Sequence, residues 1–187
     1  MVPLSLASRH DKMFAAFRRL FSRFRPKRKP VEEDLVGDAK TFSEAVNRQR
    51  IKHFTAKELQ TLGASHYDQK SRGFGLNAAP PRSTWNNILR LARVLDIIRD
   101  RVEVPVRIHS CYRSRPYNMA IGGALNSQHL HGKAADISAP KISTGNLWRI
   151  VIAIRDSGAF EGGIGFYQSS GFVHVDIRGS RADWRQA

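Results

Sequence analysis

The sequence contains a single cysteine, Cys111, in 187 residues, so no disulfide can form within the chain. It also lacks any run of 18 or more apolar residues, which argues against a membrane-spanning helix. The apolar stretch at residues 4–7 is too short for the core of a signal peptide, and we therefore expect none. The length suits one domain with a tail, since it is too short for two full-sized domains.

Acidic residues are also few. The chain has 16 Asp and Glu against 31 Lys and Arg, which gives a net charge of +15. This excess favours polyanionic partners, such as nucleic acid, anionic lipid, or cell-wall polymers that carry carboxylates and phosphates. The chain has no base-reading motif, so we expect no specific nucleic-acid partner.

Much of the positive charge lies at the N-terminus, where residues 1–30 hold nine basic residues and one acidic residue. Apolar side chains recur there at steps of three and four, which predicts an amphipathic helix. Those side chains are Phe14, Phe17, Leu20, Phe21 and Phe24. For residues 9–29 three roles stay open: binding to an anionic membrane surface, docking on a protein, or folding only when bound.

Three segments are expected along the chain. Residues 1–30 form the basic tail, and residues 31–50, which follow two prolines and turn acidic, form a linker. Residues 51–187 form the main domain.

The periodicity of the main domain predicts an α+β fold, with a small, mostly antiparallel sheet and helices packed on one side. Long helices are expected over residues 83–102 and 145–157, because each has a continuous apolar stripe. On the first helix, Asp96 is expected to point away from that stripe. Shorter helices are expected after Thr55, which forms a capping pattern with Glu58, and over residues 117–121. Strands are expected over residues 104–109, 134–137, 164–167 and 172–177.

Two histidines and an aspartate stand out as candidate metal ligands. His129 and Asp136 lie seven residues apart with Gly132 between them, which suits a loop and a short strand converging on one point. His174, near the C-terminus, would be the third ligand. Two His and one Asp, with a fourth position left to water, is typical of a catalytic zinc site rather than a structural one. Such a zinc implies metal-assisted hydrolysis.

The residues around these ligands resemble a known family. Ser127, His129, Gly132, Ala134 and Asp136 match the pattern Ser-x-His-x-x-Gly-x-Ala-x-Asp. This pattern resembles the signature of the zinc D-Ala-D-Ala carboxypeptidases, the LAS-type peptidoglycan peptidases of the M15 group.

Two further segments extend the resemblance over roughly residues 54–187. Residues 110–114 are similar to the family's Ser-Gly-Tyr-Arg-Ser segment, with Cys111 where a glycine is usual. Residues 162–167 and 172–176 resemble its last strands, in the branch that ends in His-Val-Asp.

The resemblance implies a fold like that of Hedgehog and the DD-peptidases, and a Zn²⁺-dependent peptidase that cuts stem peptides or crosslinks of peptidoglycan. Carboxypeptidase and endopeptidase activity both remain open. Action at the cell envelope or periplasm is then expected, and a phage lysis or virion-associated enzyme is one setting. The alternative is a zinc-containing module that binds the cell wall without catalysis.

The resemblance also implies roles for residues near the metal. Arg113 would bind a substrate carboxylate or stabilise the oxyanion on the scissile carbonyl. Ser127 would donate a hydroxyl to the substrate, and Tyr112 and Tyr117 would wall the cleft.

Asp176 is expected in the same cleft as His174, because residues two apart in a strand share one face. Many relatives carry an acidic general base three residues before the last histidine, where this chain has Gly171. Asp176 is therefore a candidate for the general base, or for the acceptor that orients a ligand histidine. His131 is expected to point away, and His109 is interpreted as a packed or solvated histidine.

Overall fold

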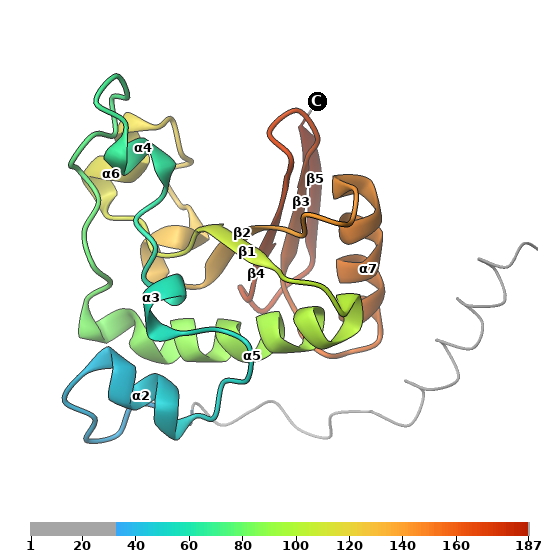
Figure 1. Ribbon diagram of the computed structural model, residues 1–187, viewed down its shortest axis with the longest axis horizontal. Coiled ribbons are helices and arrows are strands. Elements are labelled where there is room, and N and C mark those ends of the chain that lie inside the picture. Colours follow the sequence, from blue (N-terminus) through green and yellow to red (C-terminus); the bar gives the residue numbers. More distant parts are fainter. Residues whose placement is uncertain (1–32, 187) are drawn as a thin grey trace, which may run out of the picture.

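The computed structural model describes residues 33–186 (Figure 1), so the expected tail helix lies outside the described residues. One five-stranded sheet has the order β1-β2-β4-β3-β5. All neighbouring strands are antiparallel except β3 and β5, which are parallel. The strands are β1 (Arg107–Ser110), β2 (Ala134–Ser138), β3 (Gly163–Tyr167), β4 (Phe172–Asp176) and β5 (Ala182–Gln186).

Two long helices, α5 (Trp85–Val102) and α7 (Thr144–Asp156), pack against the sheet (Figure 1). The α+β prediction is thus confirmed, and α5 and α7 match the helices expected over residues 83–102 and 145–157. Among residues 33–186, no helix is both long and apolar enough to cross a bilayer. The shorter helices are α2 (Phe42–Arg48), α3 (Ala56–Leu59), α4 (Ala64–Tyr67) and α6 (Arg115–Ala120), and the 3-10 turns are η1 (Arg82–Thr84) and η2 (Gln128–His131).

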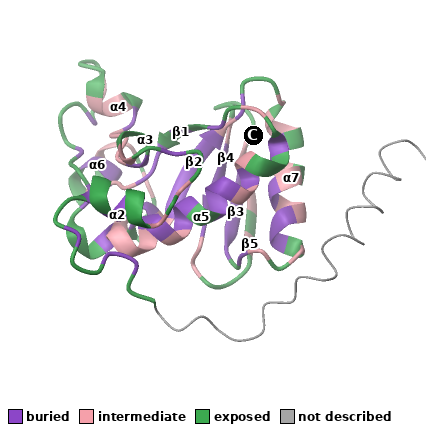
Figure 2. Cartoon of the chain, turned by 60° about the horizontal axis from the view of Figure 1, so that its bottom comes forward, coloured by how far each residue is buried: buried purple, intermediate pink, exposed green. Residues whose placement is uncertain are grey.

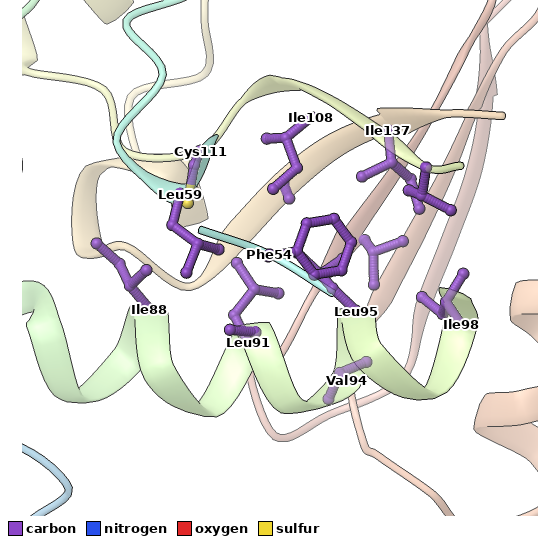
Figure 3. Close-up of a cluster of buried hydrophobic side chains, with 14 of the residues drawn as sticks. Phe54, Leu59, Ile88, Leu91, Val94, Leu95, Ile98, Ile108, Cys111 and Ile137 are labelled. Carbon is purple, nitrogen blue, oxygen red and sulfur yellow. The ribbon is translucent and has the colours of Figure 1, made fainter. Parts of the chain in front are cut away.

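The hydrophobic core lies between α5 and the sheet. Figure 2 shows buried residues along α5 and along the central strands. In Figure 3, side chains of α5 face Phe54, Ile108 and Ile137 across the core. Full burial of such aliphatic and aromatic side chains contributes about 1.5–3 kcal/mol each. The core therefore fixes one face of β1 and β2 and leaves their other face for a site.

Asp96, expected to point away from the apolar stripe of α5, is nonetheless buried. Its side chain is 9% exposed, and its carboxylate accepts hydrogen bonds from the backbone N–H groups of Lys52 (2.8 Å) and His53 (3.0 Å). These two amides precede α3 and would otherwise need water, because no helix or strand pairs them. Asp96 thus ties the chain before α3 to α5, a role that its position off the apolar stripe did not indicate.

Two other features differ from the sequence-based expectations. The segment that includes Leu35, Phe42 and Val46, within the range expected as a linker, is buried in the core, and Phe42 packs on Trp85 with ring centroids 5.4 Å apart. Strand β5 was not expected, because its residues alternate weakly between apolar and polar. Its partner β3, which is well predicted, supplies the hydrogen bonds that make β5 a strand.

Candidate active site

The site lies on the face of the sheet opposite the core. Asp136 on β2 pairs directly with His174 on β4, whereas their neighbours Ile137 and Val173 form the next pair and point into the core. This alternation follows from the period of two in a strand. Along the same row across the sheet come Gly165 on β3 and Trp184 on β5.

The third candidate ligand comes from a turn, not from the sheet. His129 lies in η2, which ends at Gly132 with a φ of +64°. A Cβ at residue 132 would approach the Ile88 side chain to 2.8 Å and the Thr84 carbonyl oxygen to 3.1 Å. Both the left-handed backbone and the close approach require glycine, which explains this position of the motif.

The ligand atoms of the three residues converge. His174 Nδ1 lies 2.9 Å from Asp136 Oδ1, and His129 Nε2 lies 3.2 Å from both of these atoms. All three side chains are buried, with exposed fractions of 2%, 4% and 6% for His129, Asp136 and His174. Together they form a cluster that could hold a metal ion.

The outer nitrogen of each histidine determines what the inner nitrogen offers. His129 Nδ1 lies 2.5 Å from the carbonyl oxygen of Cys111, so it must carry a proton and donate it. His174 Nε2 lies 3.1 Å from Asp176 Oδ2 and donates in the same way. In the neutral rings, the inner nitrogens then present lone pairs toward the Asp136 carboxylate. Three acceptors facing one point repel one another unless a cation or a proton lies between them.

The acid-base state of the cluster fits this arrangement. Burial lowers the pKa of His129, which keeps its ring neutral. For Asp136, burial would raise the pKa, but the neighbouring His129, His174 and Arg113 outweigh it and hold the pKa well below its usual range. Asp136 is therefore a carboxylate at neutral pH, as a metal ligand requires.

Asp176 is fully buried beside His174. Its Oδ1 accepts from the Gly163 N–H at 2.9 Å, and Arg178 donates from Nη2 to Oδ2 at 2.5 Å. Burial would raise the pKa of Asp176, but the hydrogen bonds from His174 and Arg178 outweigh it and lower the pKa well below its usual range. Both carboxylate oxygens are thus occupied, and the group is a poor proton acceptor.

Arg113 projects from the loop after β1 toward Asp136. Its Nε donates to Ser110 Oγ at 2.8 Å, and its Nη2 forms an ion pair with Asp136 Oδ2. The neighbouring Cys111 is fully buried, and burial raises the pKa of its thiol to about 12. Cys111 therefore acts through its backbone carbonyl and not as a thiolate.

A cleft of about 730 Å³ opens over the cluster. Arg113, Ser127 and Tyr117 line it, as expected. Tyr112 does not, because it packs against the hydrophobic core, so its expected place in the cleft wall was wrong.

Sequence reasoning missed several residues of the cleft, among them Trp184 and Arg178. Trp184 lies with its ring centroid 5.1 Å from that of His174, directly over Gly165, where a Cβ would meet the indole at 2.5 Å. Arg178 lines the cleft beside it, and so does His109, which the sequence indicated only as a packed or solvated histidine. Only the glycine pattern in β3 hinted at Trp184, because a glycine inside a strand often marks close approach by another group.

Comparison with known proteins agrees with this site. The family model described as peptidase M15 matches residues 52–176. The chain is 33% identical over 82 residues to the peptidoglycan L,D-endopeptidases MepK of Escherichia coli (strain K12) and of Shigella flexneri. That alignment covers 41% of this chain and 42% of each relative, so the chain spans less than half the length of these relatives.

The matched range contains the buried cluster and the strands that carry it. It begins just before α3 and ends at Asp176, the last residue of β4. It includes more than half of the 187 residues. The chain therefore belongs to the peptidase M15 family.

Proposed function

We propose that this protein is a zinc-dependent peptidase that hydrolyses peptide bonds in peptidoglycan. The observation that carries the proposal is the meeting of His129 Nε2, Asp136 Oδ1 and His174 Nδ1 within 3.2 Å of one another in a buried site. Two imidazole lone pairs and a carboxylate form a donor set suited to Zn²⁺, and three protein ligands leave a position open.

Zinc held by these residues would polarise a substrate carbonyl and lower the pKa of water to about 7. The chain's own residues would prepare the site for it. The Cys111 carbonyl accepts a hydrogen bond from His129 Nδ1, and Asp176 accepts one from His174 Nε2. These bonds fix both rings in the tautomer that a metal needs. Asp176 is thereby a positioning residue, and its lack of a free oxygen disfavours the general-base role that the sequence left open.

Arg113 and Ser127 would bind the substrate. The Arg113 guanidinium lines the cleft next to Asp136, where it can donate to a substrate carboxylate or to the oxyanion of the scissile carbonyl. Ser127, at the start of η2, adds a hydroxyl to the cleft lining, and the buried Tyr117 also lines the cleft.

Peptidoglycan is proposed as the substrate because relatives that are 33% identical to this chain over 82 residues carry the name peptidoglycan L,D-endopeptidase. That name favours an endopeptidase over a carboxypeptidase. Action at the cell envelope follows from the substrate, and the phage setting stays a prediction from the sequence.

The second candidate is a wall-binding module that keeps the metal and has lost catalysis. Gly171 favours it, because an exposed glycine in the turn before β4 stands where many relatives have the acidic base. The alternative predicts zinc binding and wall binding without hydrolysis.

Incubation with purified sacculi separates the two candidates. We expect the zinc-loaded protein to release peptides that mass spectrometry identifies, and a chelator to stop the release until zinc is restored. His129→Ala, Asp136→Ala and His174→Ala should each lose zinc and activity while circular dichroism stays close to that of the wild type. Full zinc content in all three variants would refute the ligand assignment.

A further inference from the structure

The cleft needs a group that moves protons, and the described residues offer few. Apart from the three candidate ligands, the titratable side chains that line the cleft are His109, Arg113, Tyr117, Tyr167 and Arg178. A guanidinium stays protonated at any working pH, and an ordinary phenol titrates near 10. No Asp or Glu other than Asp136 lines the cleft within residues 33–186. His109 is left as the one group there with an ordinary pKa near neutrality.

An irregularity in β1 places His109 on the cleft face. Ile108 pairs with Ile137 on β2, but the next paired residue is Ser110, opposite Asp136. His109 is thus the extra residue of a β-bulge, and a bulge re-aims side chains beside many active sites. Ile108 fills the core, whereas His109 is exposed in the cleft.

The His109 ring is held on that face by two neighbours. Its Nε2 lies 2.7 Å from Ser138 Oγ, and its centroid lies 6.5 Å from that of Phe172. Ser138 follows Asp136 by two residues on β2, so it lies on the same face roughly 7 Å further along the strand. If Nε2 donates to the Ser138 hydroxyl, the Nδ1 lone pair is left free to accept a proton.

We infer that His109 is the general base of the hydrolysis, and that it replaces the acidic residue absent at Gly171. The inference rests on the proposed peptidase function. Ser138 is then a positioning residue, because it acts only by orienting the ring. Asp176 cannot take the same role, since its two oxygens are occupied by His174, Arg178 and the Gly163 amide.

The proton balance of the step is simple. His109 Nδ1 takes one proton from the attacking water as the water oxygen bonds to the carbonyl carbon. The resulting imidazolium gives that proton to the amide nitrogen as the C–N bond breaks. The products are an amine and a carboxylic acid, and the acid then loses its proton to solvent. His109 returns to its neutral form.

The surroundings suit this cycle. Burial and the nearby Arg107 lower the pKa of His109, and Asp136 partly opposes them, so the ring is neutral at neutral pH. Arg107 lies on the same strand and Asp136 on β2, while β4 contributes the uncharged Phe172 to the ring's surroundings.

The test compares His109→Gln and His109→Ala with the control His131→Gln, since His131 is exposed and does not line the cleft. We expect both His109 variants to keep the zinc content of the wild type and to lose about 10²- to 10⁴-fold in kcat/KM. The control should keep full activity. Added imidazole should restore part of the activity of His109→Ala, where a space for it exists.

A second measurement does not depend on activity. In the zinc-loaded protein, NMR titration of the His109 ring should give a pKa that coincides with the acid limb of kcat/KM. Ser138→Ala should move the ring pKa and the acid limb together, which a purely structural role would not do.

Three results would overturn the inference. An active His109→Gln variant removes His109 from the chemistry while leaving the proposed function intact. If the His109 variants lose activity, but the acid limb of kcat/KM does not move and imidazole does not restore activity, His109 has only a structural role. A zinc-loaded wild type that cuts nothing overturns the proposed function itself, and this inference with it.

Discussion

Asp176 Oδ2 lies 3.1 Å from His174 Nε2, on the opposite side of the imidazole from the nitrogen that faces Asp136. The carboxylate therefore sets the tautomer of a candidate ligand without touching the place where a metal would bind. Arg178 and the Gly163 amide hold the carboxylate still. Through these contacts, a change at Asp176 should reach the metal site.

Asp176→Asn should weaken zinc binding by about 10- to 100-fold, because an amide no longer fixes the ring as strongly as a carboxylate does. Competition with a chromophoric chelator measures the affinity. Arg178→Gln is the matched variant, since it removes the partner of Asp176 and should weaken binding less. Unchanged zinc affinity with a large fall in turnover would instead favour Asp176 as the base.

Zinc affinity should fall as the pH is lowered. Burial would lower the pKa of His174, but hydrogen bonds with Asp136 and Asp176 outweigh it and raise the pKa above the usual 6.5. The metal-free site therefore holds a proton on His174 below that raised pKa, and zinc must displace it. His129, with its lowered pKa, adds no second proton near neutrality.

Calorimetry in buffers of different ionisation enthalpy counts the released protons. We expect about one proton per zinc below the His174 pKa and fewer above it, because metal ligands must be deprotonated. In Asp176→Asn the release should shift to lower pH. Proton release that does not change with pH across this range would contradict the assignment of His174 as a ligand.

Gly132→Ala should destabilise the fold and distort η2. The residue has a φ of +64°, and the added Cβ would press on Ile88 and the Thr84 carbonyl. A strained backbone costs on the order of 1–3 kcal/mol, and the steric contact adds to it. Gly75→Ala is the control, because Gly75 has a φ of +69° with no atom within 4 Å of the new Cβ.

Thermal unfolding of the metal-free and zinc-loaded forms measures the stability and the zinc affinity of both variants. Gly132→Ala should lose more stability than Gly75→Ala, and it alone should lose zinc affinity, because η2 carries His129. Equal losses in the two variants would mean that backbone strain, and not packing on Ile88, explains the glycine.

The basic tail should be separable from catalysis. Deleting residues 1–30 removes eight of the fifteen net positive charges and none of the residues of the cleft. We expect the truncated protein to cut soluble wall fragments at the normal rate and to bind anionic vesicles less well. The difference should shrink with salt, because charges are screened over about 10 Å at 0.1 M.

Phe17→Ser with Phe21→Ser tests the apolar part of the same interaction. This double variant should weaken vesicle binding even at high salt, since burial of apolar surface does not depend on screening. Equal sedimentation of the full-length and truncated proteins with vesicles at low salt would contradict membrane binding and favour a protein partner.

The fold was predictable where one element carries its own pattern. The apolar stripe of α5, the capping pair Thr55 and Glu58, and the strand around Val173 and Val175 each follow from local periodicity, and the structure shows them. Asp96 and β5 escaped prediction, because each depends on a partner distant in sequence. The Asp96 carboxylate accepts hydrogen bonds from two backbone amides before α3, and β5 forms its strand hydrogen bonds with β3.

The residues that could bind a metal were already visible in the amino-acid sequence. The spacing of His129, Gly132 and Asp136, with a strand histidine at residue 174, is a local pattern of residue types, and it needs no knowledge of packing. Family membership followed from the same residues. The net charge and its concentration in residues 1–30 were equally visible.

The contacts that each of these residues makes depend on how distant parts of the chain fold together. The tautomer of His129 depends on the Cys111 carbonyl, which lies 18 residues away in the sequence. Strand spacing already indicated Asp176 as a candidate acceptor for His174, but not that Arg178 and the Gly163 amide occupy its oxygens. The direction of the His109 side chain depends on a bulge in β1, which exists only when β1 pairs with β2. Hydrogen bonds and strand register are relations between separate parts of the chain, so spacing along the sequence cannot fix them.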